Sequence, residues 1–116
     1  MSQEILQLQR KLREFARERD WEQFHSPRNL ATALSVEASE LLEHFQWLRP
    51  EDGAGVPEGK RPAVEEEMAD VLIYLLRLAD VLEVDLLSIS ENKLAANAKK
   101  YPVERSRGSS AKYTEF

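Results

Sequence analysis

Apolar residues recur every three or four positions along most of this chain, which is the spacing of one face of an α-helix. A first helix is predicted from about residue 2 to residue 19 by the spacing of Ile5, Leu8, Leu12 and Phe15. Ser26 followed by Pro27 predicts the start of a second helix, because serine is a good N-cap and proline fits the first helical position. This second helix is expected to run to about Leu48.

A third apolar series begins at Arg61–Pro62, and Asp85 is placed to cap a fourth helix that should end near Tyr101, before Pro102. Between the second and third helices, three of the four glycines cluster between Pro50 and Pro62 and predict a loop. The tail from residue 103 to 116 lacks a period and is expected to be irregular and mobile. No segment alternates as a strand would. The pattern predicts a single all-α domain over residues 1–116, built as a four-helix bundle.

The second and third predicted helices follow one template with an offset of thirty residues. With Glu37 and Glu67 as origins, apolar residues stand at matching offsets in both helices: Leu34/Val64, Ala38/Met68, Leu41/Val71, Leu42/Leu72, Phe45/Leu75 and Leu48/Leu78. On a helical wheel these positions form an apolar arc about 120° wide. Residues outside this arc, Ile73, Leu76 and Val81, find no place in so small a core and suggest association with other subunits.

Each of these helices also carries an acidic pair on the margin of its apolar arc. The pairs are Glu37 with Glu40 and Glu67 with Asp70. If the two arcs pack together, four carboxylates meet, and they would resist ionising together unless a cation balances them. Oxygen ligands suit Mg²⁺ or Mn²⁺. The matched positions favour metal binding over a merely solvated acidic face, which is the alternative.

Charge and composition exclude several classes of protein. The chain has 16 basic and 21 acidic residues and a formal charge of -5, which argues against a general nucleic-acid binder. Without cysteine there is no disulfide scaffold, thiolate zinc site or cysteine nucleophile. The longest uncharged stretch, Asn29–Val36, is too short to cross a membrane, and the first residues do not resemble a signal peptide. We therefore expect a cytoplasmic protein.

Aromatic and polar side chains accompany the acidic pairs. Tyr74 should border the acidic group, and Trp47 is expected on the same side of its helix as Glu40. Trp21 and His25 belong to the connection between the first two helices, where an aromatic ring could stack on a nucleobase. On the fourth helix the polar residues Lys93 and Asn97 share a face that could reach phosphate oxygens or a base edge. Each of these residues could equally be an ordinary surface or core-edge side chain.

An ordered series of motifs resembles the all-α nucleoside triphosphate pyrophosphatases of the MazG-like superfamily, and within it the dCTP pyrophosphatase branch. The motifs are ExxE at Glu37–Glu40, ExxD at Glu67–Asp70, ERDWEQFHSPRNL, ELLEHFQW, EEEMADVLIYL, KLAANAKKYP and SSAKYTEF. The resemblance implies Mg²⁺-dependent hydrolysis of the α–β phosphoanhydride of a (deoxy)nucleoside triphosphate such as dCTP. It also implies helical dimers or tetramers whose subunits complete one another's sites.

The resemblance assigns roles by position. Glu37, Glu40, Glu67 and Asp70 match the metal ligands, with Mg²⁺ as the expected ion and Mn²⁺ as a substitute. The matching substrate-binding positions are Trp21, Glu22, Gln23, Phe24, His25, Trp47, Tyr74, Lys93 and Asn97. The chain departs from its relatives at Leu12, where some carry a histidine, and at His44, where they carry a leucine-like residue. Both departures touch the edge of the expected base pocket.

We hypothesise that Glu40 accepts a proton from the attacking water, with metal polarisation and positioning supplying most of the acceleration. One alternative is a non-catalytic helical interaction module whose acidic cleft binds a basic partner. A di-iron or di-manganese bundle ranks last, because it needs a Glu-x-x-His pair and Glu40 lies four residues from His44.

Overall fold

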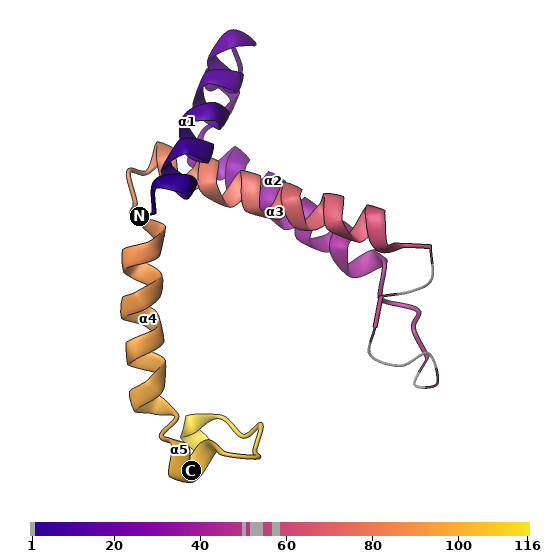
Figure 1. The fold of residues 1–116 in the computed structure, drawn as a ribbon, viewed down its shortest axis with the longest axis vertical. Coiled ribbons are helices and arrows are strands. Elements are labelled where there is room, and N and C mark those ends of the chain that lie inside the picture. The colour runs from indigo at the N-terminus through magenta and orange to yellow at the C-terminus, as the bar shows by residue number, and fades with distance from the viewer. Residues whose placement is uncertain (1, 50, 52–54, 57–58) are drawn as a thin grey trace. The chain divides into compact units, whose positions relative to one another are not determined.

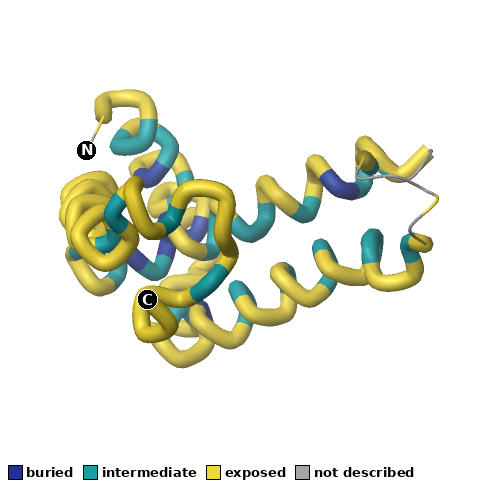
Figure 2. Tube along the Cα trace, turned by 90° about the horizontal axis from the view of Figure 1, so that it is seen from below, coloured by how far each residue is buried: buried dark blue, intermediate teal, exposed yellow. Residues whose placement is uncertain are grey.

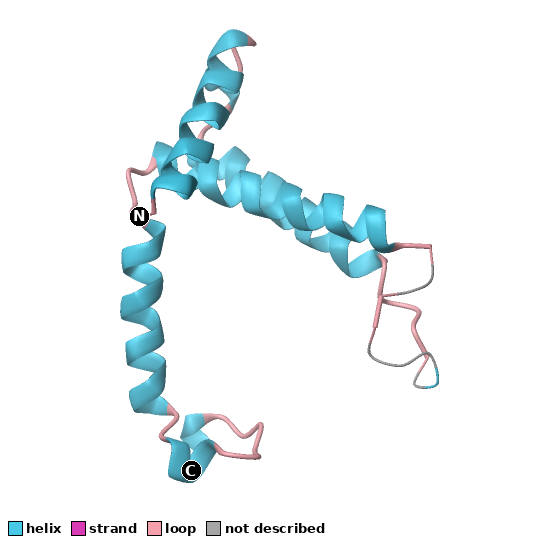
Figure 3. Cartoon of the chain, in the orientation of Figure 1, coloured by secondary structure: helices cyan, strands magenta, loops and turns pink. Residues whose placement is uncertain are grey.

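The computed structural model describes residues 2–49, 51, 55–56 and 59–116, and all regular structure among them is helical (Figure 3). The prediction of an all-α chain is confirmed. The predicted loop between Pro50 and Pro62 lies partly outside the described residues, and Pro62 itself already belongs to a helix. The elements are α1 (Gln3–Glu18), η1 (Glu22–Phe24), α2 (Pro27–Glu43), α3 (Arg61–Val81), α4 (Leu86–Lys100), α5 (Val103–Ser106) and η3 (Tyr113–Glu115).

The chain divides into two compact units, Gln3–Val84 and a second that comprises mainly Asp85–Phe116. The first unit holds α1, η1, α2 and α3. The second holds α4, α5 and η3. Within the described part of the chain, no helix is both long enough and apolar enough to cross a membrane.

The end of α1 is a Schellman motif, which explains how Trp21 is brought back against this helix. The amide of Trp21 donates to the carbonyl of Ala16 at 2.9 Å, and the amide of Asp20 donates to the carbonyl of Arg17 at 3.1 Å. Asp20 adopts the left-handed conformation that this motif requires, with φ of 54°. The turn reverses the chain so that the ring of Trp21 contacts Phe15 of the same helix.

The start of α2 is confirmed, but its predicted end is wrong. The Ser26 hydroxyl caps the helix by accepting from the amide of Asn29 at 3.1 Å. At the other end α2 stops at Glu43 instead of about Leu48, and the chain continues in tight turns to Trp47. Pro50 disfavours helical geometry just before it, and the aromatic residues in this stretch have low helix propensity. Trp47 therefore lies outside the helix, and its predicted angular position beside Glu40 does not apply.

The helices α2 and α3 run antiparallel and side by side, as Figure 1 shows. The buried apolar residues of this unit are Ala16, Leu30, Val64, Leu76 and Ala79. They lie mostly where α1 meets the ends of α2 and α3, and few positions farther along the hairpin are buried (Figure 2).

The observed burial differs in two ways from that expected for the apolar arc of the second and third predicted helices. Leu76, which was expected to find no place in the core, is 1% exposed because α1 packs against that side of α3. The amide of Gln9 on α1 donates to the Leu76 carbonyl at 3.0 Å across the same contact. Conversely Leu42, Met68 and Leu72, which belong to the predicted arc, are exposed.

The second unit confirms the predicted start and end of the fourth helix. Asp85 caps α4 by accepting from the amide of Ser88 at 3.1 Å, and Tyr101 is its C-cap. The tail is less irregular than predicted, since it contains the helical turns α5 and η3. The rings of Tyr113 and Phe116 pack edge-on against Tyr101, each with centroids 5.9 Å apart, and this aromatic cluster explains the local order.

Candidate functional site

Three of the four predicted acidic ligands come together between α2 and α3. A carboxylate oxygen from each of Glu37, Glu67 and Asp70 lies within 4.8 Å of the other two, and all three side chains are half-buried. Glu40, one turn along α2 from Glu37, is half-buried but lies outside this group of three. The arrangement follows from the thirty-residue template, because antiparallel packing brings the two origin glutamates face to face.

The carboxylates of this group repel one another, and no basic side chain among the described residues contributes to the pKa shift of Glu37. The pKa of Glu37 is raised to about 7, chiefly by the adjacent Glu67 side chain, then by burial, and then by Glu40 and Asp70. One oxygen of Glu37 and one of Glu67 are buried without a hydrogen-bond partner within the described structure. Buried carboxylate oxygens that lack a partner are costly unless an ion or water meets them. The group could therefore bind a metal ion, and its all-oxygen donors suit a hard cation.

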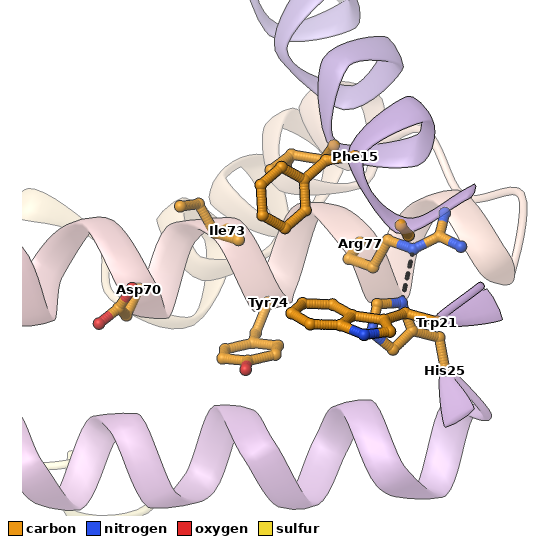
Figure 4. Close-up of a pocket in the computed structure, with 9 residues that line it drawn as sticks. Phe15, Trp21, His25, Asp70, Ile73, Tyr74 and Arg77 are labelled. Atoms are coloured by element: carbon orange, nitrogen blue, oxygen red, sulfur yellow. Dashed lines mark hydrogen bonds between the residues drawn. The ribbon is translucent and has the colours of Figure 1, made fainter. Parts of the chain in front are cut away.

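A cavity of about 310 Å³ adjoins the acidic group. Asp70 belongs to both, so a molecule in the cavity reaches the carboxylates directly. The lining residues are Leu12, Phe15, Ala16, Trp21, His25, Asp70, Ile73, Tyr74 and Arg77. Figure 4 shows Asp70 at one end of this cavity and Trp21 and His25 at the other.

The walls of the cavity are mostly aromatic and aliphatic. The rings of Phe15 and Trp21 meet edge to face with centroids 5.7 Å apart, and the His25 ring lies 6.5 Å from that of Trp21. Tyr74 projects from α3 between Asp70 and this aromatic end (Figure 4). An apolar slot between flat rings, open to carboxylates at one end, fits a planar group attached to a charged one.

The structure places only some of the predicted substrate-binding residues on the cavity. Trp21, His25 and Tyr74 line it, whereas Glu22, Gln23 and Phe24 of η1 do not. Instead, Oε1 of Glu22 lies 3.8 Å from Nε of Arg17, and Nε2 of Gln23 donates to Oδ2 of Asp20. The side chain of Phe24 is 58% exposed.

Three further predicted residues lie elsewhere. Trp47 is 84% exposed and does not line the cavity. Lys93 and Asn97 lie on α4, in the second unit.

Sequence reasoning missed Arg77, Phe15 and Ile73 as cavity residues. Phe15 and Ile73 have the spacing of ordinary core positions, so nothing set them apart. Arg77 did carry a signal, because it is the one charged residue in the otherwise apolar run from Val71 to Ala79. Leu12, which was expected at the edge of the base pocket, lines the cavity.

Comparison with known proteins finds relatives that match most of the chain. The MazG-like family matches residues 32–116. Among curated proteins, dCTP pyrophosphatase 1 of Mus musculus is 51% identical over 106 residues, which are 89% of this chain. The human dCTP pyrophosphatase 1 is 50% identical over 107 residues and 89% of the chain.

A solved structure is similar in fold as well as in sequence. The crystal structure of a pyrophosphatase from Archaeoglobus fulgidus has a TM-score of 0.81 and 44% sequence identity, covering 88% of this chain and 95% of that one. The chain spans 62% of the length of the two curated mammalian relatives.

Proposed function

The chain belongs to the MazG-like family, and from that premise we propose that it hydrolyses dCTP or a modified dCTP to the monophosphate and pyrophosphate. The observation that carries this proposal is the sharing of Asp70 between a group of carboxylates and an aromatic cavity. A nucleoside triphosphate has the same two parts, a planar base and a polyphosphate that needs a cation. The mammalian relatives are named dCTP pyrophosphatase 1 and the archaeal structure a pyrophosphatase, and these names support the proposal.

The metal ion of this proposal is Mg²⁺, with Mn²⁺ as a substitute, held by Glu37, Glu40, Glu67 and Asp70. The unpartnered buried oxygens of Glu37 and Glu67 fit such an ion. When bound, it would neutralise charge on the triphosphate and on the leaving pyrophosphate. On this proposal Glu40, which lies outside the group of three, also accepts a proton from the attacking water, in addition to its place among the metal ligands.

The cavity residues position the nucleotide. Trp21 and Tyr74 hold the base and sugar between them, which fixes the α-phosphorus beside Asp70. Exclusion of water by Phe15 and Ile73 strengthens the polar contacts that remain. On this proposal Lys93 and Asn97 of α4 contact phosphate oxygens or the base edge, in keeping with their place in the family motif.

The assembly in this proposal is a homo-oligomer, a dimer or tetramer. Leu42 of α2 and its equivalent Leu72 of α3 are 62% and 47% exposed, and Met68 of α3 is 57% exposed. So many exposed large apolar side chains on two neighbouring helices are typical of an interface. The 84% exposed Trp47 is proposed to reach the cavity of a neighbouring subunit, where it would cover the base.

The test is pyrophosphate release from a panel of canonical and 5-modified deoxynucleoside triphosphates, with Mg²⁺ and then with EDTA. Hydrolysis that requires Mg²⁺ and is fastest for a dCTP-type substrate is expected. The variant Glu67→Gln should lose at least a hundredfold in kcat, whereas Glu66→Gln, an exposed neighbour, should keep normal activity. If folded protein hydrolyses none of the panel, the enzymatic proposal fails and a helical interaction module is favoured.

A further inference from the structure

Polar side chains of α1, α3 and the loop after η1 form a hydrogen-bonded series that ends at the cavity. Arg77 of α3 is 7% exposed, and its Nη1 donates to Oδ2 of Asp80 at 3.0 Å. Nε of Arg13, on α1, donates to the same oxygen at 2.9 Å. Nε of Arg77 donates to Nδ1 of His25 at 3.0 Å, as the dashed line in Figure 4 shows.

This last hydrogen bond determines the state of the imidazole. An arginine Nε always carries hydrogen, so Nδ1 of His25 must be the acceptor. The ring is therefore neutral and carries its hydrogen on Nε2, which makes Nε2 a donor. Consistent with this, burial and the charge of Arg77 lower the pKa of His25, against an opposing contribution from Glu22.

His25 and Arg77 lie at the end of the cavity away from the acidic group. Arg77 follows Asp70 by seven residues on α3, a rise of about 10 Å along the helix axis. That separation is comparable to the length of a nucleoside monophosphate. A nucleotide with its α-phosphate near Asp70 thus has its base beside Trp21 and His25 (Figure 4).

We infer that Arg77 is a positioning residue that holds His25 as a neutral Nε2–H donor, so that the cavity selects a base edge of hydrogen-bond acceptors. Cytosine presents such an edge, because O2 and the unprotonated N3 are both acceptors. Uracil presents N3–H at the same place, which would face the donor of His25. A site built to make a hydrogen bond discriminates against a base that leaves its group unpaired. The inference rests on the proposed function, because it takes the base of that substrate as the occupant.

Asp80 and Arg13 give Arg77 its fixed geometry. Arg13 holds the Asp80 carboxylate, and that carboxylate accepts from Nη1 of Arg77, while Nε of Arg77 is directed at the imidazole. A purely structural Arg77 would need only the Asp80 pair, which ties α1 to α3 through Arg13. The additional contact with a cavity residue is what suggests a role in recognition.

The first experiment measures the imidazole directly by long-range ¹H–¹⁵N NMR of the full-length protein. In the wild type, the His25 signals should show hydrogen on Nε2 and a bare Nδ1 at pH 7, with His44 as the second imidazole of the chain for comparison. In Arg77→Met the His25 titration midpoint should rise and the ring should lose its single orientation. Arg77→Lys, which keeps a cation, should preserve most of the wild-type behaviour. A wild-type His25 with hydrogen on Nδ1 would overturn the inference.

The second experiment measures base selection. The ratio of KM for dUTP to KM for dCTP should fall at least threefold in Arg77→Met. In a His25→Phe background, Arg77→Met should not change this ratio further, because the effect acts through the imidazole. Equal increases in both KM values, with the ratio unchanged, would show that Arg77 is only structural.

Failure of the two ideas can be told apart. If the wild type hydrolyses no deoxynucleoside triphosphate, the proposed function fails. The inference is then tested by titrating dCMP and dUMP, without metal, into the wild type and Arg77→Met while observing the Nε2 signal of His25. A preference of the wild type for dCMP that Arg77→Met weakens supports it, and equal binding of the two nucleotides overturns it.

Discussion

Arg13 on α1 and Asp80 on α3 form a bidentate ion pair, in which Nε of Arg13 donates to Oδ2 of Asp80 and Nη2 donates to Oδ1. Asp80 also accepts from Arg77, so one carboxylate balances two arginines. Its side chain is 12% exposed and that of Arg77 is 8% exposed, whereas that of Arg13 is 45% exposed. The ion-pair network of Arg13, Asp80 and Arg77 is therefore largely buried at Asp80 and Arg77, and the side chain of Arg13 is partly exposed to solvent.

Removing the two partners of this pair should have unequal effects on stability. Asp80→Ala leaves the buried Arg77 without a counter-charge and should lower the free energy of unfolding by about 3 kcal/mol. Arg13→Ala leaves Asp80 paired with Arg77 and should lower it by about 1 kcal/mol. Urea unfolding followed by circular dichroism measures both. Arg17→Ala, which breaks an exposed pair with Glu14, is the control and should change stability by less than about 0.5 kcal/mol.

The same ion-pair network predicts how the protein responds to acid. The side chain of Arg13, followed by the other arginine contacts, lowers the pKa of Asp80 below its ordinary value of 3.8. A lowered folded pKa contributes stability that is present above the ordinary value and is lost as the pH falls through the folded value. The free energy of unfolding should therefore fall more steeply with decreasing pH below about pH 4. In Asp80→Asn this fall should be shallower. An unchanged acid transition in Asp80→Asn would contradict the pairing.

Much of this architecture could be predicted from the sequence because it rests on local signals. The starts of α2 and α4 follow from Ser26–Pro27 and Asp85, and the period of apolar residues gives the helices themselves. The meeting of Glu37 with Glu67 follows from the repeated template of α2 and α3. These features depend on neighbours in sequence or on one antiparallel pairing.

Two kinds of feature could not be predicted: helix ends that lack their usual glycine, and contacts between residues distant in the sequence. The ends of α1 and α3 are Schellman motifs with Asp20 and Glu83 in the left-handed conformation, where a glycine would have been the recognisable signal. The burial of Leu76 depends on which side of α3 the helix α1 covers. The role of Arg77 could not be predicted from the sequence because its partner at the cavity, His25, lies 52 residues away.

The contribution of the acidic group to stability should depend on pH in the opposite sense to that of Asp80. The pKa of Glu37 is raised to about 7 from an ordinary 4.5, so without metal its contribution to stability is present below 4.5 and is lost as the pH rises through 7. At pH 8, Glu37→Gln without metal should be more stable than the wild type by about 1 kcal/mol, after allowance for solvent screening. The difference should shrink as the pH falls toward 4.5.

Thermal melts at several pH values, with EDTA and with Mg²⁺, measure this effect. Added Mg²⁺ should stabilise the wild type at pH 8 and have little effect on Glu37→Gln. Glu66→Gln, which changes an exposed glutamate of the same helix as Glu67, should behave as the wild type does. Equal stabilisation of all three proteins by Mg²⁺ would remove Glu37 from the proposed metal site.

The exposed leucines of α2 and α3 should control the oligomeric state. Leu42→Glu with Leu72→Glu places charges on the face that the proposal assigns to a second copy. Because these side chains are already exposed within one chain, the variant should keep its helical content and become monomeric, with Kd raised at least a hundredfold. Analytical ultracentrifugation measures the mass. Leu94→Glu, at a 70% exposed leucine of α4, is the matched control, and dissociation by it alone would place the interface elsewhere.

The two tryptophans should act in the same site from different chains. Trp21 lines the cavity of its own chain, whereas Trp47 is 84% exposed and is proposed to reach a neighbour. Loss of one base-stacking ring lowers binding by about 1–3 kcal/mol, so Trp21→Ala and Trp47→Ala should each reduce kcat/KM for dCTP at least fivefold. In a dimer that combines one chain of each variant, one site lacks both rings and the other keeps both. A purified heterodimer with two different tags should then recover about half of the wild-type activity. Activity no higher than the mean of the two variants would place both rings in one chain's site, or Trp47 outside it.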